Sequence, residues 1–258
     1  MSDLNQSHPR NRDSLDVSVI IVSYNTCEMT LTCIDSVFRE TQQHSLGTIV
    51  VDNASNDDSA QAIGKKFPLV RLIASKENLG FAAANNLAAR GAQGKYLLLL
   101  NPDTVVLNGA IDRLVDFAER HPEGGIFGGR TLFGDGSLNP TSCWRVPSAW
   151  GLTCRALGIS GLARNSPLFN YDSYGGWARD TMQPVGIVSG CFLLGFFYPE
   201  SKSVRRSPVN SQTCSLRNVI RSKIFTQSKK IISLGIIVDR IGFAILIINE
   251  LIFSGSKF

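Results

Sequence analysis

The chain has 258 residues, of which 43% are hydrophobic and 18% are charged, a composition that excludes an intrinsically disordered protein. The formal net charge is +5, but residues 201–258 hold ten Lys/Arg and two Asp/Glu, whereas residues 1–200 hold sixteen Lys/Arg and nineteen Asp/Glu. The main part of the chain is therefore slightly acidic, and we expect no nucleic-acid partner.

Cysteine usage and the N-terminus both indicate a cytoplasmic protein. The six cysteines are single and widely spaced, without a C-x-x-C pair, and the chain has only three histidines, which makes a zinc site unlikely on composition. Scattered thiols suit a reducing compartment. Residues 1–16 are polar and lack the apolar segment of a secretion signal, so we expect a disordered N-terminus.

From Val17 onward, predicted strands alternate with predicted helices. Continuous β-branched runs such as VSVIIVSY at 17–24 are typical of strands buried on both faces. Apolar residues at helical spacing, as at Leu31, Ile34 and Val37, indicate helices. The predicted strands are 17–24, 48–53, 69–74 and 95–100, and the predicted helices cover 26–39, 60–67, 81–88 and 111–118. This order predicts an α/β fold with a mostly parallel sheet and helices on both faces.

After residue 124 the pattern becomes less regular. GGIFGG at 124–129 predicts a short strand before a Gly-rich turn, and residues 140–180 hold all three tryptophans with little periodicity. VGIVSGCFLLG at 185–195 again predicts a strand. Asp135 and Arg145 are candidates for contacts with a sugar or an acceptor, and the tryptophans for stacking or core packing.

Polar residues follow all four predicted strands. Ligands of open parallel sheets bind at the carboxyl ends of the strands. The polar segments there are Ser23-Tyr24-Asn25, Asp52–Asn56, Glu77–Phe81 and Asn101–Asp103. Each has a structural alternative, since SNDDS can cap a helix and both N-P-D and ENLG can form turns. Their convergence on one edge favours a ligand site, and the absence of G-x-G-x-x-G and P-loop motifs disfavours a Rossmann dehydrogenase or a P-loop kinase.

The motifs VSVIIVSYN, IVVDNASNDDS, ENLGFAAANN and LLLLNPDTVV, in this order, resemble the inverting glycosyltransferases of family 2, which have the GT-A fold. The likeness covers residues 17–194. Within the family, the sequence most resembles bacterial rhamnosyltransferases that build O-antigen and cell-wall glycans. It implies transfer of L-rhamnose from dTDP-rhamnose to a lipid-diphosphate-linked saccharide in lipopolysaccharide biosynthesis. It also implies a cytoplasmic location, peripheral to the inner membrane.

The resemblance assigns site residues to this chain. The nucleotide-sugar site would comprise Ser23, Tyr24, Asn25, Asp52, Asn78, Gly80, Asn85 and Asn101. Asp52 would accept the N–H of the pyrimidine base, and Asn101 stands where many family members carry the first acid of a D-x-D element. Asp103 would bind Mg²⁺ or Mn²⁺, which offsets the charge of the departing diphosphate. The end of a buried strand would hold this carboxylate rigidly.

The C-terminal region departs from the family pattern. An inverting transfer needs a general base, which in this family belongs to an acidic pair beyond the V-S-G-x-x-x-L strand, here VSGCFLL at 188–194. The only acids after residue 194 are Glu200, Asp239 and Glu250, and Glu200 is the remaining candidate base. We therefore expect an impaired or inactive enzyme.

Three interpretations of the basic, Ser- and Ile-rich residues 195–258 remain open: a foreign or replaced segment, a divergent native end, or a membrane-associating segment. In the last case the Ile/Leu-rich residues 231–253 would form an interfacial helix. Two other functions also remain open. One is a non-catalytic nucleotide-sugar binder or membrane-associated remnant. The other is a nucleotidyltransferase, although SYNTCEM lacks the Gly-rich basic loop expected after the first strand.

Overall fold

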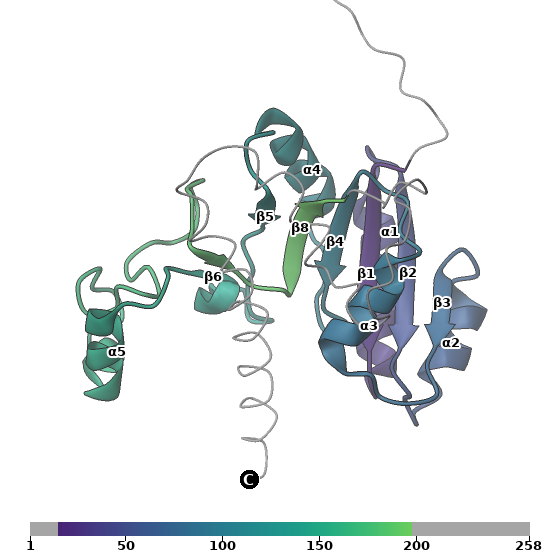
Figure 1. The fold of residues 1–258 in the computed structure, drawn as a ribbon, viewed down its shortest axis with the longest axis horizontal. Coiled ribbons are helices and arrows are strands. Elements are labelled where there is room, and N and C mark those ends of the chain that lie inside the picture. The colour runs from purple at the N-terminus through teal and green to yellow at the C-terminus, as the bar shows by residue number, and fades with distance from the viewer. Residues whose placement is uncertain (1–14, 198–258) are drawn as a thin grey trace, which may run out of the picture.

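A six-stranded sheet forms the centre of the protein, whose computed structural model describes residues 15–197 (Figure 1). The strand order is β3-β2-β1-β4-β8-β5. Four strands are parallel to one another: β1 (Val17–Ser23), β2 (Leu46–Asp52), β3 (Arg71–Ala74) and β4 (Tyr96–Leu100). β8 (Phe192–Phe196) is antiparallel to both of its neighbours, β4 and β5 (Ile126–Gly128). The predicted α/β class with a mostly parallel sheet is confirmed.

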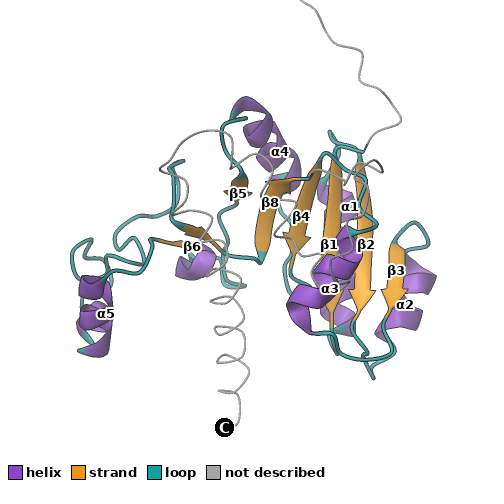
Figure 2. Cartoon of the chain, in the orientation of Figure 1, coloured by secondary structure: helices purple, strands orange, loops and turns teal. Residues whose placement is uncertain are grey.

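Helices cover both faces of the sheet, as predicted (Figure 2). On one face lie α1 (Cys27–Glu40), α2 (Ser59–Lys66) and α4 (Ala110–Arg120), whose buried apolar residues form one core cluster with alternate residues of β1, β2 and β4. On the other face lies α3 (Gly80–Ala89), which packs Ala84 and Ala88 against Ile20 and Val51. Because successive residues of a strand point to opposite faces, a strand apolar at every position is needed to supply both clusters.

The element boundaries differ most from the prediction in two places. β3 begins at Arg71 because Pro68 and Leu69 lie in the preceding turn, where Leu69 is 88% exposed. The single strand predicted for 185–195 is two strands, β7 (Ile187–Val188) and β8, which belong to different sheets. The residues between them, Ser189–Cys191, include a glycine and let the chain change direction.

The region predicted to lack regular structure contains four short elements. They are the 3₁₀ helix η1 (Pro140–Ser142), the strand β6 (Cys143–Trp144), and the helices α5 (Ala149–Ala156) and α6 (Ile159–Leu162). β6 pairs antiparallel with β7, and this two-stranded sheet joins the region to the rest of the fold.

Ordered structure extends beyond both predicted domain limits. Leu15 and Asp16, expected in the disordered N-terminus, accept hydrogen bonds from the backbone of Lys95 and Tyr96 through their carbonyl groups at 3.0 and 2.9 Å. At the other end, β8 continues past Leu194 and the Phe197 backbone donates to the Lys95 carbonyl at 2.9 Å. Glu200 and residues 231–253 lie outside the described residues. Among residues 15–197, no helix has the length and apolar character that crossing a membrane requires.

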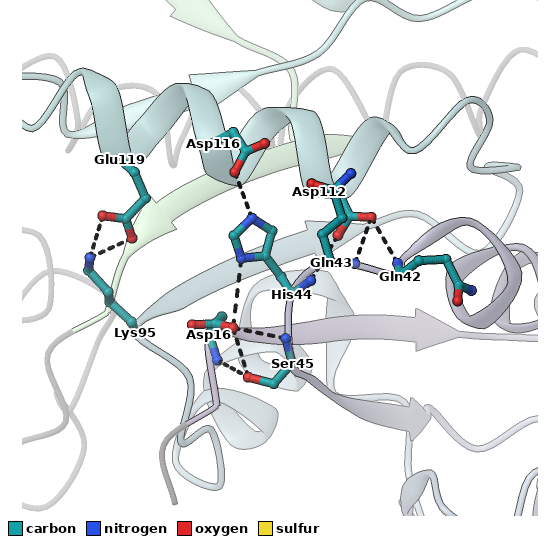
Figure 3. A network of polar contacts seen from close by, with 9 residues as sticks. All are labelled: Asp16, Gln42, Gln43, His44, Ser45, Lys95, Asp112, Asp116 and Glu119. Carbon is teal, nitrogen blue, oxygen red and sulfur yellow. Dashed lines mark hydrogen bonds and ion pairs between the residues drawn. The ribbon is translucent and has the colours of Figure 1, made fainter. Parts of the chain in front are cut away.

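A polar network at the amino ends of the strands fixes the loop between α1 and β2 (Figure 3). The buried Asp112 carboxylate of α4 accepts three successive backbone N–H groups, from Gln42 at 2.8 Å and from Gln43 and His44 at 3.2 Å. The His44 ring lies between two carboxylates, with Nε2 2.9 Å from Asp116 and Nδ1 3.7 Å from Asp16. The loop, α4 and the start of β1 are therefore tied together.

We predict that Asp112→Ala lowers the free energy of unfolding by about 2–3 kcal/mol, because three backbone donors lose a charged acceptor. Urea denaturation would measure this loss. Asp35→Ala is a suitable control, since Asp35 forms an exposed ion pair with Arg39 at 3.4 Å, and should cost under about 0.5 kcal/mol. Equal losses in the two variants would contradict the assigned role of Asp112.

Candidate functional site

The ends of β1 and β2 lie side by side at the carboxyl edge of the sheet. The parallel register pairs Ser23 with Asp52, and the Asn53 backbone donates to the Ser23 carbonyl at 2.8 Å. Asp52 is only 4% exposed; its Oδ2 accepts a long hydrogen bond from the Ser55 backbone at 3.4 Å. Its Oδ1 is buried and has no hydrogen-bond partner among the described residues. A buried carboxylate oxygen without a donor is costly, so this atom is suited to accept a hydrogen bond from a ligand.

The loops that follow β1 and β2 hold each other in a strained conformation. Asn25, Ala54 and Asp58 all have positive φ angles, of 53°, 67° and 58°. The Asn25 backbone donates to Ser55 Oγ at 3.0 Å, and the Asn56 backbone donates to Asn25 Oδ1 at 2.8 Å. Left-handed conformations are unfavourable for residues with a side chain, and such strain is concentrated at functional sites.

Asp57 joins the N-termini of two helices. Its Oδ2 accepts the backbone N–H of Cys27 at 2.9 Å, at the first residue of α1, and its Oδ1 accepts from the hydroxyl and backbone of Ser59, at the first residue of α2. The hydrogen bond from the Ser59 hydroxyl is the main cause that lowers the pKa of the Asp57 carboxyl. The carboxylate is occupied by the fold itself. The N-cap residue of α2 is Asp58, whose side chain makes no capping hydrogen bond, and Asp57 before it binds the first backbone N–H of each helix instead.

Hydrogen bonds of two side-chain amides hold the loop before α3. Asn53 Nδ2 donates to Asn78 Oδ1 at 2.7 Å, and Asn53 Oδ1 accepts from the Leu79 backbone at 2.9 Å. Asn78 Oδ1 also accepts from the backbone of Gly80, whose φ is +74°. Sequence reasoning did not single out Asn53, although its position directly after Asp52 was a usable signal.

Two predicted nucleotide-site residues are buried inside the fold. Ser23 Oγ lies 3.1 Å from Thr26 Oγ1 and 2.9 Å from Thr30 Oγ1, in a cluster of hydroxyl groups beneath the β1 end. Asn85 is buried in α3 and donates to the Phe81 carbonyl at 2.8 Å. Tyr24, by contrast, is exposed.

The end of β4 presents an exposed carboxylate. The Asn101 backbone donates to the Cys191 carbonyl at 3.1 Å, and the Asn101 carbonyl accepts from the Thr104 backbone at 3.2 Å. This turn holds Asp103 at the surface above Cys33. Burial, followed by the negative charge of Asp103, raises the pKa of the Cys33 thiol to about 12. Cys33 is therefore a protonated, inert thiol at neutral pH.

Within residues 15–197, no group of three or more His, Cys, Asp or Glu side chains could hold a metal ion. Asp103 could contribute one hard oxygen ligand, and a ligand's diphosphate would have to contribute others. This set of ligands, one protein carboxylate together with diphosphate oxygens, fits a cation that binds as a complex with the nucleotide.

The other two candidates lie in the region after β5. Asp135 is exposed and its Oδ1 accepts from the Ser137 backbone at 2.9 Å, so it forms a turn. The Arg145 guanidinium lies over the rings of Tyr171 and Tyr174, with centroid distances of 4.3 and 4.5 Å. The structure gives Asp135 a turn-forming role and packs Arg145 between aromatic rings.

A parallel sheet covered on both faces, with polar strand ends gathered at one edge, places the protein in the GT-A-like class of nucleotide-sugar folds. The family model for glycosyl transferase family 2 matches residues 18–186. The chain belongs to that family, and its domain is that of a glycosyltransferase.

Among curated relatives, the chain is similar to N-acetylglucosaminyl-diphospho-decaprenol L-rhamnosyltransferase of Mycobacterium tuberculosis (strain CDC 1551 / Oshkosh). The two are 32% identical over 117 residues, which cover 41% of this chain and 38% of the relative. It is also 30% identical over 130 residues to the O-antigen biosynthesis protein RfbC of Myxococcus xanthus, covering 49% of this chain and 10% of that protein. The chain therefore matches well under half the length of either relative.

Solved structures show a weaker likeness. The mannosyltransferase PcManGT from Pyrobaculum calidifontis, in complex with GDP-Man and Mn²⁺, is 24% identical with a TM-score of 0.42, covering 46% of this chain and 36% of that one. S. aureus TarS 1-349 in complex with UDP is 18% identical with a TM-score of 0.42, covering 53% and 39%.

We predict that the stabilising effect of Asp57 depends on pH. A carboxyl whose pKa is lowered by folding stabilises the fold above its unfolded pKa, and this contribution disappears as the pH falls through the folded pKa. Asp57→Ala should therefore cost about 1 kcal/mol at pH 7 and progressively less below about pH 4. Denaturant titrations from pH 7 to pH 2.5 would measure it. Glu77→Ala is the control, and a difference independent of pH would refute the prediction.

Proposed function

We propose that the carboxyl edge of the sheet binds dTDP-rhamnose and that the protein descends from enzymes that transfer L-rhamnose to a lipid-diphosphate-linked saccharide. The observation that carries this proposal is Asp52 Oδ1 at the end of β2, which is buried and has no hydrogen-bond partner among residues 15–197. A pyrimidine base offers an imide N–H that such an oxygen can accept. The similarity to the M. tuberculosis rhamnosyltransferase and to RfbC supports the choice of sugar and of an O-antigen or cell-wall acceptor.

The roles of the other residues follow from their places at this edge. Tyr24 and Asn25 would flank the base beside Asp52, and the loop of Asn78 and Gly80 would lie near the ribose and phosphates. Ser23 and Asn85 would support the site from beneath its surface, since both are buried and already hydrogen-bonded within the fold. Asn101 would shape the turn that carries Asp103.

Asp103 would hold a divalent cation, Mg²⁺ or Mn²⁺, together with the donor's diphosphate. The cation would supply positive charge to the leaving diphosphate. Asp103 is suited to this role because it is exposed and because the end of β4 fixes its position through Asn101 and Cys191. With a single protein carboxylate, affinity for the cation would depend on the nucleotide.

We further propose that the chain as given binds its donor but transfers little or no sugar. Deprotonating an acceptor hydroxyl requires a base, and the sequence after β8 has no acidic pair, only Glu200, Asp239 and Glu250. A non-catalytic nucleotide-sugar binder at the cytoplasmic face of the inner membrane is the second candidate, favoured by the same absence. The lipid-linked acceptor and the peripheral membrane location belong to this proposal.

The first test concerns recognition of the pyrimidine base. Asp52→Asn should weaken dTDP binding about tenfold, because it replaces a charged acceptor of the imide N–H with a neutral amide oxygen. Isothermal titration calorimetry would measure the dissociation constant, with Asp35→Asn, an exposed residue of α1, as the control variant. Unchanged affinity in Asp52→Asn would remove the main support for the proposed site.

The second test concerns the cation. Mg²⁺ or Mn²⁺ should strengthen binding of dTDP to the wild type about tenfold or more, and this gain should vanish in Asp103→Asn. Thymidine, which has no diphosphate, should bind both proteins equally with or without the cation. Asp35→Asn is the matched control. A cation effect that survives Asp103→Asn would assign the ligand to another residue.

The third test concerns transfer itself. The purified chain, given dTDP-rhamnose, a divalent cation and a lipid-diphosphate-linked GlcNAc acceptor, should show no product above background. Replacing residues 198–258 with a family C-terminus that contains the acidic pair should restore transfer, since β8 and Phe197 complete the sheet. Transfer by the unaltered chain would overturn the proposal of impairment.

A further inference from the structure

Residues 145–170 form a compact projection, here called the α5–α6 lobe, that stands apart from the six-stranded sheet (Figure 1). Ser148 caps α5 by accepting the Gly151 backbone N–H at 2.9 Å, and Trp150 Nε1 donates to the Leu168 carbonyl at 2.9 Å. Ser160 Oγ donates to the Phe169 carbonyl at 2.7 Å. The lobe is therefore held together by its own hydrogen bonds.

The outer face of α5 is unusually apolar. Its sequence is AWGLTCRA, in which Gly151 and Cys154 are buried and point inward. The exposed residues of α5 are Ala149, Trp150, Leu152, Thr153, Arg155 and Ala156, of which only Thr153 and Arg155 are polar. Large apolar side chains such as Trp150 and Leu152 on an exposed surface are often contact residues.

The apolar surface continues beyond α5. Leu157 is 67% exposed in the turn after α5, Leu162 is 92% exposed at the end of α6, and Leu168 and Trp150 are exposed beside each other. An isolated exposed leucine needs no explanation, but several in one lobe indicate an interaction surface.

The charge of the lobe is opposite to that of the sheet. Residues 145–170 contain three arginines, Arg145, Arg155 and Arg164, and no Asp or Glu. Residues 15–135 contain fourteen Asp/Glu and ten Lys/Arg. Arg164 is exposed, and Arg155 lies 3.5 Å from Asp172 at the base of the lobe with its side chain 57% exposed.

We propose that the α5–α6 lobe docks the protein on the surface of an anionic lipid bilayer. Exposed leucines together with a tryptophan suit the boundary between head groups and acyl chains, where an indole ring is favourably placed. Arg164, which is exposed and forms no ion pair among residues 15–197, is suited to attract anionic head groups. The proposal rests on the membrane location included in the proposed function and names the surface that would provide it, whichever sugar is transferred.

The connection of the lobe to the sheet relates this surface to the proposed site. Ser142, just before β6, accepts the Ser189 backbone N–H at 2.9 Å, and Cys191, two residues further, accepts from Asn101 at the end of β4. The lobe is thus joined through β6 and β7 to the same carboxyl edge. Docking by the lobe would hold that edge close to a lipid-linked substrate in the bilayer.

Flotation of the full-length protein with vesicles tests the proposal, using phosphatidylglycerol/phosphatidylcholine mixtures and phosphatidylcholine alone, without donor or acceptor. We expect binding to the anionic vesicles. Leu157→Gln/Leu162→Gln should weaken it at least tenfold, because each buried leucine is worth roughly a factor of ten. Leu69→Gln, at an 88% exposed leucine on the sheet domain, should leave it unchanged.

The charge contribution is measured in the same way. Arg164→Gln should weaken binding to anionic vesicles about fivefold, whereas Lys65→Gln, an exposed residue of α2, should have no effect. Thermal unfolding of each variant confirms that the fold is retained. dTDP binding, measured separately, should be the same in the four variants and the wild type. A failure of the donor site is thereby distinguished from a failure of the lobe.

Two outcomes would overturn the proposal. One is the absence of binding to anionic vesicles, or binding that the double leucine variant does not weaken, which would assign any membrane affinity to another part of the chain. The other is a concentration-dependent dimer in sedimentation that the double variant abolishes, with no vesicle binding, which would assign the lobe to contact with a second copy.

Discussion

The hydrogen bonding of β1 between two parallel neighbours is the constraint on which the proposed site depends. Ser23 pairs with Asp52 on one side, and Ile21 pairs with Leu100 on the other, so the polar residues after β1, β2 and β4 must emerge at one edge. This register is fixed by the two apolar cores, since a slip of one residue would exchange the faces of a strand buried on both. Asp52 and Asp103 are brought to the same edge by the backbone.

Side-chain hydrogen bonds then hold the loops that follow the paired strands. Asp57 spans the starts of α1 and α2, and Asn53 holds the loop that precedes α3. These contacts stabilise loops in which Ala54 has a φ of 67°, an unfavourable conformation for alanine. Among the polar side chains at the ends of β1 and β2, Asp52 stands out because one of its oxygens is buried and unsatisfied among the described residues. Among the described residues, the fold thus uses most of the polar groups at this edge for its own support and leaves one oxygen of Asp52 without a donor.

Much of this arrangement could be predicted from the sequence, because short apolar strands alternate with helices that carry apolar residues at helical spacing in the first four βα units. α5 was not predicted, since AWGLTCRA buries only Gly151 and Cys154 and has no stripe of large apolar residues at helical spacing. The burial of Ser23 and Asn85 could not be deduced either, because it depends on Thr30 and on the packing of α3. The division of 185–195 into β7 and β8 depends on pairing with β6, β4 and β5, which no local pattern reveals.

The central claim is that one edge of the sheet binds a nucleoside diphosphate through Asp52 at the base and Asp103 at a cation. A crystal structure of the protein with dTDP and Mn²⁺ tests it most directly, because the anomalous scattering of manganese locates the ion independently. The account predicts a pyrimidine imide N–H within hydrogen-bond distance of Asp52 Oδ1, and manganese bound by Asp103 and the diphosphate. Manganese away from Asp103, or a base that leaves Asp52 Oδ1 without a donor, would contradict it.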